Sequence, residues 1–166
     1  ALGTDTGGSI RQPASFNGVV GVKPTYGAVS RYGVVAMASS TDTIGVLANS
    51  VDDAELVMDI LSGKDTKDMT TLPDFFTPTS VDSPKRLGVI KECMSDEVDV
   101  EVRNAVKSYI AGMEKKGHIV EEVSLSMLKY ALAIYYIVVP AEISSNLGRY
   151  DGVRYGTRSK NARVLS

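Results

Sequence analysis

The sequence is poor in the residues on which disulfides and many catalytic centres depend. Among its 166 residues are one cysteine, Cys93, one histidine, His118, and no tryptophan. A single cysteine cannot form a disulfide within the chain, so the sequence carries no sign of an oxidising compartment. We predict no metal site.

Strong charge of one sign and long apolar runs are also missing. The formal net charge is −2, which gives no overall basic field for nucleic acid. No uninterrupted apolar run reaches the roughly 18 residues of a transmembrane helix, and no charged-then-apolar leader opens the chain. Hydrophobic residues make up 43% of the chain, so we expect a soluble cytoplasmic protein with a core and no membrane partner.

Short apolar runs separated by turn signals occupy the first third of the chain. Residues 18–24, 32–40 and 43–50 are each typical of a strand or a buried extended segment. Ser50 is a good N-cap, and the apolar spacing after it predicts a helix that ends near Gly63.

The second half shows a strand–helix–strand pattern. Residues 85–90 and 118–123 are typical of strands, and residues 99–116 between them have apolar side chains at helical spacing. This order predicts a right-handed βαβ crossover with parallel strands. A further helix is predicted over residues 126–147, with a kink or break at Pro140.

A polar stretch separates these two parts. Residues 64–84 contain three of the six prolines, which predicts a surface connection. We therefore divide the chain into residues 1–63, this connection, and residues 85–166, which hold the βαβ unit and the helix after it.

The stretch Gly7-Gly8-Ser9 does not fit the better-known glycine motifs. A phosphate-binding P-loop needs a lysine directly after its last glycine, and here Ser9 follows Gly8. The dinucleotide spacing G-x-G-x-x-G is absent. The nucleophile elbow G-x-S-x-G needs a glycine where this chain has Arg11. All three interpretations therefore fail on the residues.

What the stretch does offer is a run of backbone N–H donors from Thr6, Gly7, Gly8 and Ser9. Amides in such a turn can converge on one anion, and a hydroxyl beside them suits acyl transfer through an oxyanion. A Gly-Gly turn with a capping serine is the alternative interpretation of the same residues.

A serine nucleophile needs a base, and the sequence shows no convincing one. His118 follows a predicted helix end and has no evident carboxylate partner. Lys23 closes a predicted strand, where a charge that reaches solvent is the simpler interpretation. The residues alone leave Ser9 without an activating partner.

Longer motifs connect the chain to a known family. The opening GTDTGGSIRQPASFNGVVGVKPTYG closely resembles the second half of the amidase signature, G-[ST]-D-x-G-G-S-[IV]-R-x-P-A. The match continues in VSRYGVVAMASSTDTIGVLANSVDDAELVMDIL and in PAEISSNLGRYDGVRYG at 140–156, a block characteristic of the A subunits of tRNA-dependent amidotransferases. The resemblance implies an α/β fold, with a mixed β-sheet core covered by helices that is incomplete in this chain.

The resemblance also implies roles for the opening residues. Ser9 would be the nucleophile that forms an acyl ester, and Thr6, Gly7 and Gly8, with the N–H of Ser9, would form the oxyanion hole. The family completes a Ser–cis-Ser–Lys triad with a lysine and a second serine that precede this motif. We therefore expect a fragment that lacks the N-terminal and C-terminal parts of the domain and is inactive alone.

Further residues receive expected roles from the same resemblance. Asp5 and Arg11 would brace the loop, and Tyr136, preferred over Tyr135, would help to hold glutamine. Asn17 stands where relatives usually have cysteine, a change expected to affect packing more than chemistry.

The implied activity is glutamine hydrolysis, which supplies ammonia for the conversion of Glu-tRNA(Gln) to Gln-tRNA(Gln). The amidotransferase B and C subunits would be its partners: the B subunit would bind tRNA and use ATP and Mg, and the C subunit would brace the pair. The glutaminase subunit would need no cofactor. The basic segment 149–163 is interpreted as a solvated surface or partner contact rather than an RNA site.

Two other functions stay open at this point: a general amidase of the same family, and a non-catalytic structural fragment. Missing strands would leave apolar faces uncovered, so we also expect the isolated chain to self-associate.

Overall fold

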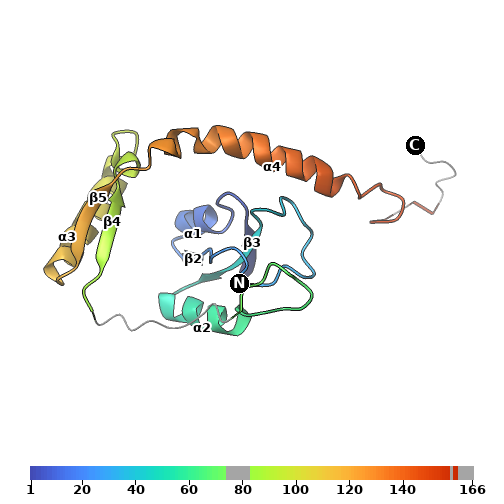
Figure 1. Cartoon of the computed structure of the whole chain (residues 1–166), viewed down its shortest axis with the longest axis horizontal. Helices are drawn as coiled ribbons and strands as arrows, with labels where there is room; N and C mark the ends of the chain where they lie inside the picture. Colours follow the sequence, from blue (N-terminus) through green and yellow to red (C-terminus); the bar gives the residue numbers. More distant parts are fainter. Residues whose placement is uncertain (74–82, 158, 161–166) are drawn as a thin grey trace. The chain divides into compact units, whose positions relative to one another are not determined.

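The computed structural model describes residues 1–73, 83–157 and 159–160 of the chain (Figure 1). Along the chain, strands and helices alternate, as expected for an α/β protein.

The chain divides into two units. Unit 1 comprises residues 1–77 together with 135–166, and unit 2 comprises residues 78–134. This division differs from the one expected from the sequence, because most of helix α4 (Ala131–Leu147) belongs with the N-terminal part and not with the βαβ segment.

Unit 1 contains a three-stranded antiparallel sheet. Strand β3 (Thr43–Ala48) lies in the middle, with β1 (Leu2–Asp5) on one side and β2 (Val20–Val22) on the other. The strands predicted within 18–24 and 43–50 are therefore confirmed.

The expectation of an extended segment at 32–40 is wrong. Val34 donates its amide to the carbonyl of Arg31 at 3.0 Å, and Gly33 between them has φ +89°. A glycine with positive φ at this place favours a tight turn over a strand. Val35, which follows the turn, is 63% exposed.

One face of the sheet packs against helix α2 (Val51–Leu61), and the contact forms a buried apolar cluster of Val29, Ile44, Val46, Ala54 and Met58. The predicted N-cap is confirmed, because the Ser50 hydroxyl accepts a hydrogen bond from the amide of Asp53 at 3.1 Å.

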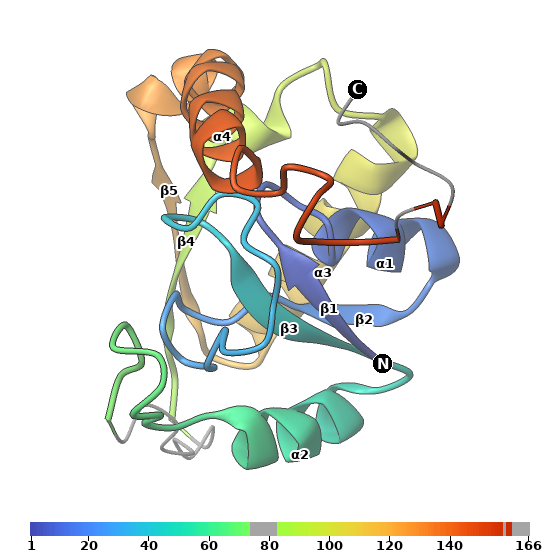
Figure 2. The ribbon, with the colours of Figure 1, turned by 90° about the vertical axis from the view of Figure 1, so that its right-hand side faces the viewer.

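The opposite face of the sheet carries the short helix α1 (Arg11–Asn17), as Figures 1 and 2 show. Glycine makes this close approach feasible. A Cβ at Gly21 would lie 2.6 Å from the Cβ of Ala14, and a Cβ at Gly45 would overlap the carbonyl oxygen of Val22. This packing positions the segment that precedes α1, where the candidate site lies.

Unit 2 is the predicted βαβ element. Strands β4 (Arg86–Ile90) and β5 (Ile119–Val123) pair in parallel, and helix α3 (Val100–Lys115) connects them after a 3₁₀ turn at Lys91–Met94. The parallel pairing predicted from the sequence is confirmed.

Helix α4 follows a 3₁₀ turn at Ser126–Tyr130 and continues through Pro140, so the predicted break at that residue is wrong. A proline removes one helical hydrogen bond, here the bond to the carbonyl of Tyr136. Tyr136 is exposed, and solvent can satisfy its carbonyl. By length and composition alone, Ser126–Leu147 could also cross a membrane, although it contains no uninterrupted apolar run of that length.

Candidate active site

Ser9 lies in a tight loop between a strand and a helix. Strand β1 ends at Asp5 and helix α1 begins at Arg11, so residues 6–9, the glycine loop, must turn the chain. Gly8 has φ +153°, at the edge of the range that side chains avoid, and its carbonyl accepts a hydrogen bond from the amide of Gln12 at 2.8 Å. Ser9 is exposed at this loop.

The buried carboxylate of Asp5 is hydrogen-bonded to the residues that follow the loop. Asp5 is fully buried and accepts hydrogen bonds from Arg11 Nε at 3.0 Å and Nη2 at 3.1 Å, and from the amides of Ile10 and Arg11 at 3.2 and 3.3 Å. Burial acts to raise the pKa of Asp5, but these hydrogen bonds outweigh it and hold the pKa below its usual value. The geometry suits the bracing role expected for Asp5 and Arg11.

A second buried carboxylate, Asp42, holds the other end of the loop, and sequence reasoning missed it. Its Oδ1 accepts a hydrogen bond from Thr6 Oγ1 at 2.7 Å, and its Oδ2 accepts from the amides of Met37 and Ala38 at 2.8 and 3.0 Å. Thr6 and Asp42 are 36 residues apart in sequence. They meet because β1 and β3 are antiparallel and their pairing ends at Asp5 and Thr43, which are the sequence neighbours of Thr6 and Asp42.

One tyrosine of helix α4 lies against the loop. A Cβ at Gly7 would overlap the ring of Tyr135, so only glycine fits there. Tyr136, which the sequence analysis preferred, is 66% exposed, and its ring meets that of Tyr135 edge to face. Binding of glutamine by either ring stays a prediction, but Tyr135 is the one beside the predicted oxyanion hole.

The two residues weighed as bases for Ser9 have other partners. His118 Nδ1 accepts a hydrogen bond from the amide of Lys85 at 3.0 Å and thereby ties the start of β4 to β5. Lys23 Nζ donates to the carbonyl of Pro24 at 2.6 Å. Across residues 1–73, 83–157 and 159–160, no hydrogen bond joins the Ser9 hydroxyl to a base.

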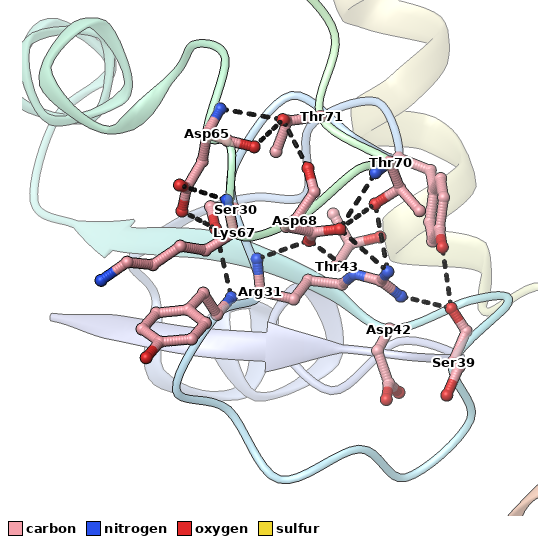
Figure 3. Close-up of polar contacts among 12 residues, drawn as sticks. Ser30, Arg31, Ser39, Asp42, Thr43, Asp65, Lys67, Asp68, Thr70 and Thr71 are labelled. Atoms are coloured by element: carbon pink, nitrogen blue, oxygen red, sulfur yellow. Dashed lines mark hydrogen bonds and ion pairs between the residues drawn. The ribbon is translucent and has the colours of Figure 1, made fainter.

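A second polar cluster centres on Arg31 (Figure 3). Its Nε donates to Asp68 Oδ2 at 3.1 Å, Nη2 donates to Thr70 at 3.1 Å, and Nη1 donates to the carbonyl of Ser39. The side-chain hydrogen bond from Arg31 holds the pKa of Asp68 far below its usual value.

Asp68 and Thr71 are both buried, so the first part of the predicted surface connection 64–84 is folded into unit 1. Most of the other residues of 64–73 are exposed, so the stretch combines a surface with a hydrogen-bonded cluster. Residues 74–82 of that connection lie outside the described residues.

Comparisons with known proteins identify the family of the chain. Residues 1–166 match the family model described as "Amidase". The chain belongs to the amidase family. Its fold is accordingly α/β, with the strands and helices of a larger amidase present in part.

Individual relatives place the chain more closely within the amidase family. It is 54% identical to the A subunit of glutamyl-tRNA(Gln) amidotransferase from Halothermothrix orenii, covering 97% of this chain and 35% of that protein. Its fold resembles the crystal structure of the A subunit of glutamyl-tRNA(Gln) amidotransferase from Thermotoga maritima, with a TM-score of 0.81 and 43% identity over 94% of this chain and 34% of that one.

A more distant amidase structure is also similar. A peptide amidase in complex with the competitive inhibitor chymostatin has a TM-score of 0.75 and 31% identity over 96% of this chain and 34% of that one. The chain thus spans about a third of the length of each of these relatives.

The remaining residues singled out in the sequence make local contacts where the structure describes them. In the basic segment 149–163, Asp151 pairs with Arg154 at 2.9 Å, and residues 158 and 161–163 lie outside the described part. Asn17 is exposed and donates to the carbonyl of Pro13 at 2.8 Å. The interpretation of this segment as a solvated surface or partner contact stays a prediction.

Proposed function

We propose that the chain is part of the glutaminase subunit of a tRNA-dependent amidotransferase, with Ser9 as the nucleophile. The observation that carries the proposal is the Gly7-Gly8-Ser9 turn, fixed at its two ends by the buried carboxylates Asp5 and Asp42. The 54% identity to the A subunit of a glutamyl-tRNA(Gln) amidotransferase supports the choice of this branch of the amidase family.

In this reaction Ser9 Oγ attacks the side-chain amide carbon of glutamine. The amides of Thr6, Gly7, Gly8 and Ser9 donate to the oxyanion that forms on the amide oxygen. Collapse of this intermediate expels ammonia and leaves an acyl ester on Ser9, which water then hydrolyses to glutamate. The base that takes the Ser9 proton is the lysine of the family triad, acting with the cis-serine, and both would come from residues outside this sequence.

The ammonia would serve the conversion of Glu-tRNA(Gln) to Gln-tRNA(Gln) on the B subunit, which binds tRNA and uses ATP and Mg, with the C subunit bracing the pair. The glutaminase subunit itself would hold no cofactor. Such an assembly works on tRNA in the cytoplasm, which is therefore the proposed location.

The central test uses a chain of the relatives' full length, purified with its partner subunits. Ser9→Ala should lower ammonia release from glutamine at least ~10³-fold, because the acyl ester can no longer form. Ser62→Ala is the matched control: within the described structure its buried hydroxyl has no hydrogen-bond partner, so activity should stay unchanged. Equal activity of the Ser9 variant and the wild type would refute the assignment.

A general amidase is the second candidate, since a peptide amidase shares 31% identity with the chain. Comparing glutamine with peptide amides as substrates of the same complex separates the two. Preference for peptide amides would overturn the glutaminase proposal while leaving Ser9 as nucleophile. The 166-residue chain alone should release no ammonia, and turnover by it would reveal a base within this sequence.

A further inference from the structure

The backbone of the glycine loop needs contacts with residues outside the loop to keep one conformation. Two of its four residues are glycines, which resist conformational ordering more than any other residue. Oxyanion donors must nevertheless lie about 2.7–3.1 Å from the developing charge. Asp5 fixes the side of the loop that enters helix α1, through the amides of Ile10 and Arg11. The side that leaves β1 is fixed by the hydrogen bond from Thr6 Oγ1 to Asp42.

Asp42 is itself held from two directions. Its second carboxylate oxygen accepts from the amides of Met37 and Ala38, so the carboxylate joins the glycine loop to residues 37–40. Because Asp42 is 5% exposed, solvent does not compete for these hydrogen bonds.

Helix α4 fastens residues 37–40 in turn. Asn146 Nδ2 donates to the carbonyl of Met37 at 3.1 Å and to Ser39 Oγ at 3.0 Å. The carboxylate of Glu142 accepts from the amide of Ser40 at 3.0 Å and from its hydroxyl. All of these residues belong to unit 1.

The same helix also touches the loop directly, through the ring of Tyr135 at Gly7. Tyr135, Glu142 and Asn146 are spaced by seven and four residues, which puts them on one face of a helix. This face of α4 therefore acts on the glycine loop in two ways. It contacts Gly7 directly, and it contacts residues 37–40, which are hydrogen-bonded to Asp42.

We propose that Asp42 is a positioning residue for the amide hydrolysis proposed above, holding the Thr6 and Gly7 amides in line with the oxyanion, while Glu142 and Asn146 of α4 hold residues 37–40, to which Asp42 is hydrogen-bonded. The inference rests on that proposed function. Asp42 acts through Thr6 and touches no substrate. Its loss should therefore lower the rate of the chemical step and leave ground-state binding of glutamine nearly unchanged.

The test measures kcat and KM for glutamine hydrolysis in the full-length complex. Thr6→Val removes the hydroxyl donor and keeps the side-chain shape, and it should lower kcat about 10- to 100-fold, part of the loss caused by removing an oxyanion donor. KM should change less than about threefold. Thr6→Ser restores the donor and should restore kcat.

Asp42→Ala should lower kcat at least as much as Thr6→Val, because it removes the acceptor of the Thr6 hydroxyl and of the Met37 and Ala38 amides. Combining the two changes should cost little more than Asp42→Ala alone, since both remove the hydrogen bond between Thr6 and Asp42. Asn146→Ala should give a smaller fall in kcat, because it loosens Asp42 only through residues 37–40.

Ser30→Ala is the matched control. It also removes a hydroxyl-to-carboxylate hydrogen bond, to Asp65 at 2.6 Å, but its partners lie in the Arg31 cluster. An equal fall in kcat for this variant, or a rise in KM with unchanged kcat for Thr6→Val, would refute the positioning role. Melting temperatures identify variants that have simply lost their fold.

A second readout separates this inference from the proposed function. If the wild-type complex hydrolyses no amide, the proposed function fails. The positioning is then judged from the ¹⁵N amide signals of Gly7 and Gly8 in glycine-labelled protein. These should shift in Thr6→Val and Asp42→Ala and stay in place in Thr6→Ser and Ser30→Ala, and unmoved signals in all four variants would refute it.

Discussion

The two units bury different amounts of their chain, although both combine strands with helices. Every buried side chain among the described residues belongs to unit 1, including the carboxylates Asp5, Asp42 and Asp68. Within unit 2, residues 83–134 include none that is buried, and apolar side chains such as Tyr109 stay largely exposed. Unit 1 therefore has a core of its own, whereas the apolar surface of unit 2 is left only partly covered.

This difference indicates where the chemistry lies. A buried carboxylate is costly unless hydrogen bonds satisfy it, so a small unit that buries three of them must hold the surrounding backbone closely. In unit 2 the ion pair between Arg86 and Glu121 is exposed and contributes little. The contacts that shape the glycine loop lie within unit 1.

The largest expected effect comes from a methyl group added to a glycine in the sheet of unit 1, and the same change in unit 2 is its comparison. Gly45→Ala in β3 would place a Cβ on the carbonyl oxygen of Val22, which cannot move away, so we expect a loss of about 3 kcal/mol or more in the free energy of unfolding. Gly88→Ala in β4 meets only the Val123 side chain, at 3.3 Å, and no backbone atom, so its cost should be smaller, about 1 kcal/mol. Denaturant unfolding of the full-length protein measures both, and equal losses would contradict the contrast.

The buried ion pair should give the next largest effect. Asp68→Asn leaves Arg31 without its partner and should lower the free energy of unfolding by about 2 to 3 kcal/mol at neutral pH. Hydrogen bonds from Arg31 put the folded pKa of Asp68 below its unfolded value. The stabilisation is therefore present above about pH 4 and is lost as the pH falls through the folded pKa.

Glu92→Gln in unit 2 is the matched change. The hydrogen bond from Ser124 lowers the pKa of Glu92 in the same direction, but the carboxylate is exposed and screened. Its effect on unfolding should be clearly smaller than that of Asp68→Asn. Denaturation at pH 7 and pH 3 checks both variants, and a constant difference between wild type and Asp68→Asn across this range would exclude the ion pair as the cause.

The free energy lost when a helix N-cap is removed should differ least between the two units. Ser50 caps α2 in unit 1 and Asp99 caps α3 in unit 2, where its carboxylate accepts from the amides of Glu101 and Val102 at 2.8 and 3.3 Å. Ser50→Ala and Asp99→Ala should each cost about 1 kcal/mol, because a cap is a local contact. Native-state hydrogen exchange of each helix measures the cost, and a large inequality would show that the caps depend on the core around them.

Local elements were largely predictable from the sequence. The N-cap at Ser50 and the strand within residues 18–24 follow from residues close together in the chain, and the parallel pairing of β4 with β5 follows from the order strand, helix, strand. The failures have local causes too: the turn at Gly33 overrides an apolar run, and helix α4 tolerates Pro140. Neither competing effect shows in hydrophobic periodicity.

Only the residues of the candidate site that lie close to Ser9 in the sequence were predictable. The motif around Ser9 predicts a nucleophile and its oxyanion donors, and it contains Asp5 and Arg11, which pair in the structure and are six residues apart. Asp42, 36 residues from Thr6, had no comparable signal, and neither did the choice of Tyr135 over Tyr136 as the neighbour of Gly7.

The family and the glycines that permit a tight loop follow from the amino-acid sequence, as does the prediction of Ser9 as nucleophile, because all three depend on residue type at short spacing. What holds that loop is a property of the folded chain. The pairing of β1 with β3 brings Asp42 to Thr6, and one face of α4 reaches both Gly7 and the residues beside Asp42. Contacts between distant segments depend on strand pairing and helix packing, which no short stretch of sequence contains.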